Sequence, residues 1–320
     1  MRRIVLFLLS LLLGLVGCDR PQGYVRKGGT WHYGDSTVQP EDAATFKPLN
    51  DSFARDGKRG YYRDEAIADS DGPSFEALGD HEAKDRLAVY YADTYRKGQE
   101  YWSIRHLRVT LVRDADPSSY RLLTHGYARD RQRVFFEGQA FSVREVESFT
   151  PLNAQFARDQ VRGYYQRVEI PGSDGASFAL IGEHEDHYVR DRKQVYYAEI
   201  KTDDPNRGAH PVARPLRDAD PTSFRALERG YAADAAQVWY RGAPLTRDVA
   251  GFALLPRSYA RTSTQVFYDG RPVRGADAAS FAELETPTEQ ADAKDAKNSY
   301  LQGRRIDLTA TTTSAVRSRE

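Results

Sequence analysis

A short pattern of apolar and polar positions recurs along the chain and is most regular between Tyr127 and Leu152. Tyr127-Ala128-Arg129 is followed by four polar residues beginning with Asp130, and then by the apolar triplet Val134-Phe135-Phe136. Short apolar runs separated by turn residues predict β-hairpins, because strands are brief and their side chains alternate between two faces. The Asp side chain can accept hydrogen bonds from N–H groups just ahead of it, which favours a tight turn.

The pattern continues with a second turn and a third strand. Glu137-Gly138 is the turn pair, in which Gly supplies a positive φ, and Phe141 is the apolar residue of the strand that follows. Asp-Pro comes next in two copies, at Asp116-Pro117 and Asp220-Pro221, which predicts a single helical turn with Asp as its N-cap. We expect that turn to lay the next aromatic residue, Phe149 in this copy, onto the sheet.

The pattern occurs in eight full copies and one partial copy, each marked by its triplet. The triplets are Trp31-His32-Tyr33, Gly60-Tyr61-Tyr62, Val89-Tyr90-Tyr91, Val134-Phe135-Phe136, Gly163-Tyr164-Tyr165, Val195-Tyr196-Tyr197, Val238-Trp239-Tyr240, Val266-Phe267-Tyr268 and the partial Ser299-Tyr300-Leu301. A repeat of about 29 residues cannot bury a core alone, so neighbouring copies must stack. The sequence predicts an all-β fold, an elongated, solenoid-like array of about 8.5 hairpin copies within residues 19–306. A β-propeller is the alternative, although a propeller blade usually takes about 40 residues.

Each aromatic pair is expected to place one ring inward. The other ring, Phe135 or Tyr196 for example, is a candidate for exposure. Packing between copies is the favoured interpretation of these rings, and a face on which sugars stack is the alternative.

Two copies are interrupted by inserts. There are 21 positions from Tyr91 to Val112 and 19 from Tyr197 to Leu216, where the usual step is five. Both inserts lengthen the same hairpin of their copies, and we expect them to project from the same edge. The second insert, residues 201–215, is polar and Pro-rich, whereas the first is rich in the residue types that dominate binding hot spots. The candidate binding residues are Tyr95, Arg96, Tyr101, Trp102, Arg105 and His106. The alternative is that both are longer hairpins that pack on neighbouring copies.

The copies resemble the repeats of the DKNYY family, especially Asp295-Ala296-Lys297-Asn298-Ser299-Tyr300 and residues 188–197. Members of this family are bacterial, often lipid-anchored proteins of uncharacterised function. The resemblance extends from Tyr24 to Ile306 and implies no catalytic residues. Most copies carry Arg, Gln or Ala where the family name has Lys-Asn, so the match is one of pattern.

The N-terminus predicts an anchored envelope protein. Met1-Arg2-Arg3 precedes an almost wholly apolar stretch, residues 4–16, which is shorter than the roughly 20 residues of a membrane-spanning helix and fits a signal peptide. Leu15-Val16-Gly17-Cys18 resembles the bacterial lipobox, which implies cleavage and lipidation at Cys18. Residues 1–18 are therefore predicted to be a lipoprotein signal peptide with Cys18 as the membrane anchor. An ordinary signal peptide with an incidental Cys is the alternative.

The composition of the chain excludes some classes of ligand and some features of the fold. The chain has 46 basic and 46 acidic residues and no long run of one sign, which argues against nucleic acid as a ligand. Cys18 is its one cysteine, so an internal disulfide is excluded and packing must hold the fold together. Residues 307–320 are rich in Thr, lack apolar periodicity and are predicted to be a disordered tail.

The polar residues offer little chemistry. The recurring Asp residues, and Asp174-Gly175 among them, fit turns better than a calcium loop, which needs further oxygen ligands and a late Glu. His184-Glu185-Asp186-His187 has its two His three residues apart, where the zinc-protease helix needs four, and is interpreted as a loop. No catalytic residue, metal site or cofactor is predicted, and the protein is not expected to be an enzyme.

The sequence favours a lipid-anchored envelope protein that faces the periplasm, with the choice between inner and outer membrane open. Its expected role is that of a binding or scaffold module that engages a protein or envelope partner through the inserts. Glycan or peptidoglycan binding by exposed rings is the alternative. A hydrolase with a site assembled across copies is a third hypothesis, for which no motif speaks.

Overall fold

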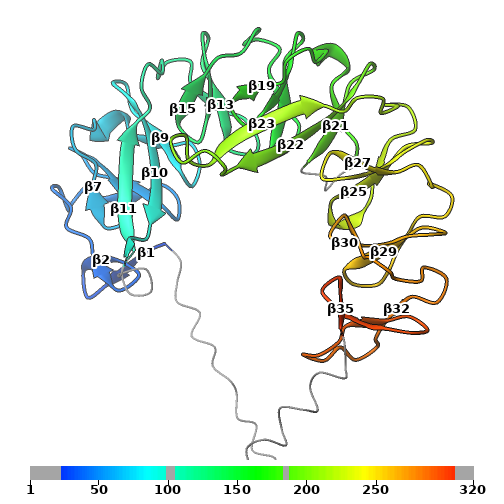
Figure 1. The fold of residues 1–320 in the computed structure, drawn as a ribbon. Coiled ribbons are helices and arrows are strands. Elements are labelled where there is room, and N and C mark those ends of the chain that lie inside the picture. Colours follow the sequence, from blue (N-terminus) through cyan, green and yellow to red (C-terminus); the bar gives the residue numbers. More distant parts are fainter. Residues whose placement is uncertain (1–22, 99–104, 183–186, 307–320) are drawn as a thin grey trace, which may run out of the picture. The chain divides into compact units, whose positions relative to one another are not determined.

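The computed structural model describes residues 23–98, 105–182 and 187–306. The predicted signal peptide with Cys18 and the predicted tail 307–320 lie outside the described residues, as do Tyr101 and Trp102. Within the described residues the chain forms nine small antiparallel sheets of three or four strands, and strands adjacent in a sheet are consecutive in sequence (Figure 1). The predicted all-β array of repeated hairpins is confirmed. No helix in the described part is long and apolar enough to cross a membrane.

The chain divides into two compact units, and the first holds residues 1–122 and 137–139. Its strands are β1 (Tyr24–Lys27), β2 (Thr30–Tyr33), β3 (Ser36–Thr37), β4 (Lys47–Pro48), β5 (Phe53–Arg55), β6 (Gly60–Tyr62), β7 (Glu65–Ala66), β8 (Glu76–Ala77), β9 (Glu82–Lys84), β10 (Val89–Tyr95), β11 (His106–Leu111) and β12 (Arg121–Leu122). A 3₁₀ turn, η1 (Gly72–Ser74), has Asp71 as its N-cap.

The second unit holds residues 123–136 and 140–320. The chain continues with β13 (Tyr127–Arg129), β14 (Val134–Phe136), β15 (Gln139–Phe141), β16 (Thr150–Pro151), β17 (Phe156–Arg158), β18 (Gly163–Tyr165), β19 (Val168–Glu169), β20 (Ala179–Leu180), β21 (Tyr188–Arg190), β22 (Val195–Lys201), β23 (His210–Pro215), β24 (Arg225–Ala226), β25 (Tyr231–Ala233), β26 (Val238–Tyr240), β27 (Ala243–Thr246), β28 (Ala253–Leu254), β29 (Tyr259–Arg261), β30 (Val266–Tyr268), β31 (Arg271–Pro272), β32 (Ala282–Glu283), β33 (Ala293–Lys294), β34 (Ser299–Leu301) and β35 (Arg304–Ile306). Two further 3₁₀ turns are η3 (Gly175–Ser177) and η4 (Glu228–Gly230).

The sheets differ from the predicted hairpin repeat at one boundary. Thr150 and Pro151, which the sequence pattern places at the end of one copy, form β16 and pair with Arg158 and Ala157 of the next. A four-stranded sheet therefore joins three strands of one copy to a closing strand from the copy before it. The chain leaves the preceding turn in an extended conformation, and its N–H and C=O groups pair with the nearest free strand edge. This strand exchange binds consecutive copies together.

The core consists of aromatic rings packed within and between copies. Phe178 illustrates this, since its ring centroid lies 6.4 Å from that of Phe156 and 6.3 Å from that of Tyr196 in the following copy. The expectation that Phe135 or Tyr196 is exposed is wrong, because both are fully buried. A narrow sheet has a neighbour on each of its faces, so the middle residue of the triplet is buried as well, while the last ring is only partly buried in copies such as that of Phe136.

The recurring Asp is a turn residue that also joins neighbouring copies, as Asp159 illustrates. One carboxylate oxygen accepts hydrogen bonds from the backbone N–H groups two and three residues ahead, both at 2.7 Å. The other accepts from the N–H groups of Arg144 and Glu145 in the preceding copy, both at 2.9 Å, and from the Tyr164 hydroxyl at 2.6 Å. Burial acts to raise the pKa of this carboxyl, but these donors outweigh burial and hold the pKa below its usual value. The same Asp–Tyr contact recurs in the pairs Asp56–Tyr61, Asp85–Tyr90, Asp191–Tyr196 and Asp295–Tyr300.

Candidate functional site

The first insert lengthens a hairpin, as predicted from the spacing. Strands β10 and β11 pair over six positions, from Tyr90 opposite Leu111 to Tyr95 opposite His106. In the copies without an insert the corresponding hairpin has two or three such pairs, as in Tyr164 opposite Glu169. The long hairpin β10–β11 therefore extends beyond the packed part of its sheet.

Side chains of the types found at binding sites contact one another at the last described pairs of the hairpin β10–β11. The rings of Tyr95 and His106 stack with centroids 5.2 Å apart, and the guanidinium of Arg108 lies 5.8 Å from the Tyr95 centroid. Arg108 is held in place by Asp93, whose carboxylate accepts a hydrogen bond from its Nε at 3.0 Å. That hydrogen bond raises the pKa of the Arg108 guanidinium, so the group stays charged.

The structure brings only some of the predicted binding residues together. Tyr95 and His106 contact each other, while Arg96 and Arg105 are exposed beside them at the ends of the two strands. Tyr101 and Trp102 lie outside the described residues. The sequence also places Arg108 among the binding-type residues of this insert, but Asp93 was missed, although its register opposite Arg108, two pairs below Tyr95, follows from the strand alternation.

The second insert forms the long hairpin β22–β23, whose six pairs run from Tyr196 opposite Pro215 to Lys201 opposite His210 (Figure 1). Arg214 ties its base to the next copy. The Nη1 of Arg214 donates to the Gly242 carbonyl at 2.9 Å, and its guanidinium lies 5.4 Å from the centroid of the Tyr197 ring. The upper part is more exposed, and Ile200 shows 42% of its surface to solvent.

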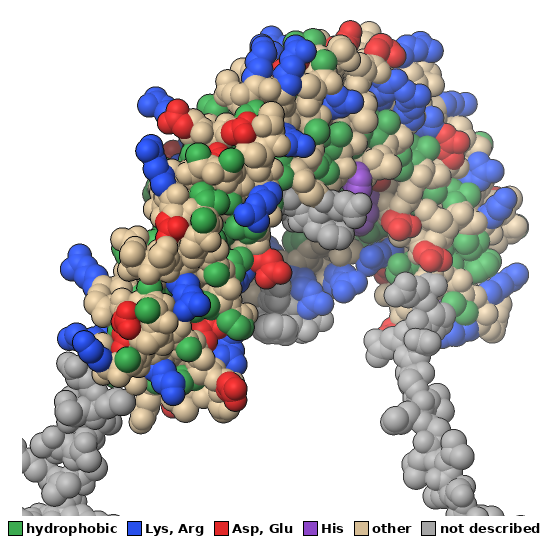
Figure 2. All heavy atoms as spheres, turned by 90° about the vertical axis from the view of Figure 1, so that its right-hand side faces the viewer, with side chains coloured by type: hydrophobic (Ala, Val, Ile, Leu, Met, Phe, Trp, Pro, Cys, Tyr) green, Lys and Arg blue, Asp and Glu red, His purple; other side chains and the backbone are tan. Residues whose placement is uncertain are grey.

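Exposed apolar side chains concentrate on these two hairpins. Of the six large hydrophobic side chains exposed within the described ranges, three lie on them: Tyr95 at 41%, Leu111 at 62% and Ile200 at 42%. Charged side chains of one sign do not gather in this way, since Lys and Arg are interspersed with Asp and Glu over the face shown in Figure 2. On the hairpin β10–β11, exposed Tyr95 lies beside Arg108, and Tyr and Arg are enriched at binding hot spots.

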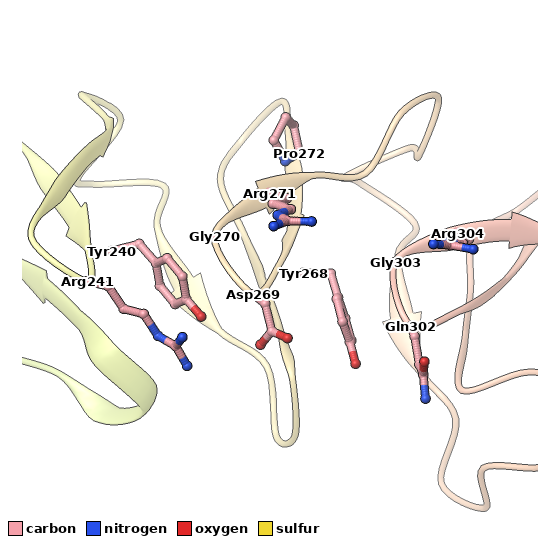
Figure 3. Close-up of a pocket in the computed structure, with 10 residues that line it drawn as sticks. All are labelled: Tyr240, Arg241, Tyr268, Asp269, Gly270, Arg271, Pro272, Gln302, Gly303 and Arg304. Carbon is pink, nitrogen blue, oxygen red and sulfur yellow. The ribbon is translucent and has the colours of Figure 1, made fainter. Parts of the chain in front are cut away.

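A groove lined by side chains from successive turns is a second feature of the second unit. One cavity, of about 630 Å³, lies between the turns that follow β26, β30 and β34, where the side chains of Tyr240, Tyr268, Asp269 and Gln302 are found side by side (Figure 3). A neighbouring cavity of about 780 Å³ shares Tyr240, Arg241 and Asp269 with it. The two cavities therefore adjoin each other, and we call them together the turn groove.

The turn groove has a local cause in the sequence. Gly242, Gly270 and Gly303 follow the last residue of their triplets by two positions, have positive φ and pack against a Tyr ring of the preceding copy. A buried Tyr hydroxyl of the preceding copy accepts a hydrogen bond from the Gly N–H in each case, for example Tyr259 from Gly303 at 2.9 Å. The regular spacing of these x-Gly turns could have revealed the groove in the sequence.

His187 has a packing role at the start of a hairpin. His187 places its Nδ1 3.0 Å from the Ala198 carbonyl oxygen and stacks on Tyr197 at 5.7 Å between centroids, which fixes the start of a hairpin. Its predicted loop partners, residues 184–186, lie outside the described residues. No group of three His, Cys, Asp or Glu side chains able to hold a metal occurs among the residues described.

A comparison with models of known protein families finds a match within the repeats. The model of the DKNYY family matches residues 140–200, which hold the Asp159–Tyr164 and Asp191–Tyr196 contacts. This segment is similar to the DKNYY family. The predicted resemblance is thereby confirmed, and the Asp and Tyr of a DKNYY copy are engaged in joining repeats. No curated protein and no solved structure matches the chain.

Proposed function

We propose that this protein is a non-enzymatic binding module of the cell envelope, which engages a protein partner through the long hairpins β10–β11 and β22–β23. The concentration of exposed apolar side chains on these two hairpins supports the proposal most directly. The stacked Tyr95, His106 and Arg108 are held by the hairpin itself, so they lose little conformational freedom on binding.

The lipid anchor belongs to the same proposal. Cys18 receives the lipid and becomes the N-terminal residue when the signal peptide is cleaved, and the repeats face the periplasm. A Cys18→Ser variant tests this, because several acyl chains on one cysteine give firm anchoring whereas none leaves only the soluble part. The wild-type protein should fractionate with membranes and the variant should not. Equal membrane retention of the two would refute the anchor.

Capture of partners from envelope extract tests the hairpins. Replacing residues 95–106 with Asn-Gly joins Thr94 to Leu107, which are register partners, and leaves the Asp93–Arg108 contact in place. Replacing residues 200–211 joins Glu199 to Val212 in the same way. We expect both shortened proteins to remain folded by circular dichroism and to lose the captured partner. If the doubly shortened protein retains every partner, the proposal fails.

A second candidate function is glycan binding in the turn groove. The groove is favoured by its two adjoining cavities and by its lining of Tyr, Arg, Asp and Gln side chains, which hydrogen-bond hydroxyl groups. Because the rings of Phe135 and Tyr196 are buried, a sugar would meet the half-exposed Tyr240 and Tyr268 instead.

Sedimentation with purified peptidoglycan separates the two candidates. Glycan binding predicts that the wild-type protein co-sediments and that the double variant Arg241→Ala, Asp269→Ala does not. The matched control is Arg274→Ala, an exposed Arg that lines neither cavity of the turn groove. Absence of co-sedimentation for the wild type rules this candidate out.

A further inference from the structure

A separate cavity lies at the base of the hairpin β22–β23, on residues that neither the turn groove nor the hairpin tip uses. It measures about 600 Å³, a size typical of sites for small ligands or single side chains. Its apolar lining includes Leu216, Trp239 and Pro244. We call it the Trp239 pocket.

Trp239 departs from the repeat in a way that leaves a polar group unused. In five other copies the middle residue of the triplet is a Tyr whose hydroxyl bonds the recurring Asp, as Tyr164 does with Asp159 at 2.6 Å. In this copy the ring is an indole that is only 3% exposed, and its Nε1 has no hydrogen-bond partner among the described residues. A buried N–H without an acceptor costs roughly 1–3 kcal/mol, so such groups in native proteins call for an explanation.

The strand beside Trp239 is also irregular. The register between β26 and β27 shifts between Val238 and Trp239, which places Pro244 opposite the indole residue. Pro lacks an N–H and is confined to edge strands and bulges, which matches its position on the edge strand β27. β-bulges redirect side chains and are common beside functional sites.

The rim of the Trp239 pocket is basic. Arg214, Arg217 and Arg247 line it together with one acid, Asp218. Arg214 is already bonded to the Gly242 carbonyl, whereas Arg217 and Arg247 are exposed and form no ion pair within the described part of the chain. Two unpaired guanidinium groups beside an apolar cavity favour a ligand that carries an anionic oxygen group and an apolar body.

We propose that the Trp239 pocket binds the C-terminal residue of a polypeptide partner, with its apolar side chain against Leu216 and Trp239 and its free carboxylate between Arg217 and Arg247. A chain end presents both features on one residue, which suits a cavity of this size better than an extended segment does. A carboxylate also supplies the acceptor oxygens that guanidinium groups need. The proposal rests on the proposed function, since the partner captured by the hairpins is the polypeptide in question.

Calorimetric titration of the full-length mature protein in detergent micelles tests the pocket directly. The probes are acetyl-Gly-Gly-Leu with a free carboxylate, the same peptide as its amide, and acetyl-Gly-Gly-Gly with a free carboxylate. We expect the first to bind, and the other two to bind at least about tenfold more weakly, because each lacks one of the two features. Equal binding of acid and amide, or no binding of the first peptide, overturns the proposal.

Variants locate the binding. Arg217→Ala and Arg247→Ala should each weaken the acid peptide about tenfold, while Arg271→Ala, an exposed Arg of the turn groove, should have no effect. Trp239→Phe should weaken it about threefold or more without unfolding the copy, because Phe135 and Phe267 occupy the same position in other copies. If Arg271→Ala weakens binding as much as the pocket variants do, the site is wrong. Binding of vesicles rich in phosphatidylglycerol that Arg217→Ala abolishes, without peptide binding, would instead assign the pocket to a lipid headgroup and refute the peptide.

The two proposals can fail separately. The replacement of residues 200–211 keeps Arg214, Arg217 and Trp239, so it should retain the peptide while losing hairpin contacts. Loss of partner capture by the shortened hairpins with full capture by the Arg217→Ala variant would sustain the proposed function and overturn the pocket. If the peptide binds and the doubly shortened protein still captures its partner, the pocket is sustained and the proposed function is overturned.

Discussion

At the scale of single residues, the recurring Asp explains much of the pattern. It satisfies N–H groups of its own turn and of the preceding copy, and its Tyr partner covers it from the core side. Where the Asp is replaced, the Tyr is replaced as well. Thr262 stands at the Asp position of its copy, with its Oγ1 3.0 Å from the Gln265 N–H, and Phe267 stands where the Tyr would be.

Removing one such Asp should loosen its turn and the joint to the copy before it. We expect Asp159→Ala to lower the local free energy of opening by about 2–4 kcal/mol, because several buried N–H groups and the Tyr164 hydroxyl lose their acceptor. Hydrogen exchange of peptides covering residues 142–165 measures this. The control is Asp203→Ala, an exposed Asp, which should change the free energy by less than about 0.5 kcal/mol. Equal effects of the two substitutions would contradict the proposed contact.

The same carboxylates predict acid sensitivity. Burial acts to raise the pKa values of Asp56, Asp85 and Asp159, but donated hydrogen bonds outweigh it and leave all three lowered. A lowered pKa contributes stability that is full above the unfolded value, near 4, and is lost as pH falls through the folded value. The pKa of Glu82 is shifted in the opposite direction, because burial raises it, but Glu82 is one group against three Asp residues.

We therefore expect the midpoint of thermal unfolding to change little between pH 7 and pH ~5 and to fall below pH ~4. The measurement is a series of calorimetric scans. The Asp159→Asn variant cannot titrate at this position and should show a shallower fall at low pH. A midpoint that already drops between pH 7 and pH 5 would show that other groups control stability.

Sequence reasoning identified the Asp turns because their cause is local. A carboxylate that bonds N–H groups two and three residues ahead needs nothing beyond its own segment. The exposure of Phe135 and Tyr196 was predicted wrongly because burial depends on what covers the second face of a sheet. Likewise, the unused Nε1 of Trp239 becomes visible only when its surroundings are known.

At the scale of elements, the x-Gly turn is a contact between copies as well as a bend. Gly270 has φ +70°, and a Cβ there would lie 2.0 Å from Cδ1 of the Tyr240 ring. Gly275, in the same copy, has φ +74° but nothing within 4 Å of its Cβ position. Substitution of Gly275 therefore tests the strain of a positive φ alone, whereas substitution of Gly270 adds the clash with the Tyr240 ring.

We expect Gly275→Ala to cost about 1–2 kcal/mol, the strain of a positive φ, and Gly270→Ala to cost at least ~1 kcal/mol more, because the Tyr240 ring must move. Hydrogen exchange of the peptides on each side of the turn gives both values. If the two substitutions cost the same, the glycine is required only for its backbone conformation. The turn groove would then tolerate side chains at this position.

Sequence spacing correctly predicted the elements that depend only on the length of a segment. The two inserts predicted long hairpins, and each pairs over six positions. The closing strands, β16 for example, were missed because two residues carry no periodicity and pair only when the next copy offers an edge. Whether the two long hairpins share an edge stays a prediction, because they belong to different compact units.

At the scale of the whole molecule, packing contacts between adjacent copies hold the fold together. Within the second unit each cluster of buried rings draws on adjacent copies, as in the cluster that contains Tyr259, Phe281 and Tyr300. No disulfide can replace these contacts, because the chain has one cysteine. Stability in such an array is approximately a sum of repeat terms and nearest-neighbour terms.

Removal of the last copy tests this additivity. A protein that ends at Leu284 loses the Tyr300 ring, 5.2 Å from that of Phe281, and the Gly303 N–H and Asp292 carboxylate that bond the Tyr259 hydroxyl at 2.9 and 2.7 Å. We expect protection against hydrogen exchange to fall throughout residues 253–272 and to stay unchanged in residues 156–200, because those copies keep both neighbours. A loss of protection spread evenly over the second unit would instead show that it unfolds as one cooperative body, and single-copy substitutions would then act on all of it.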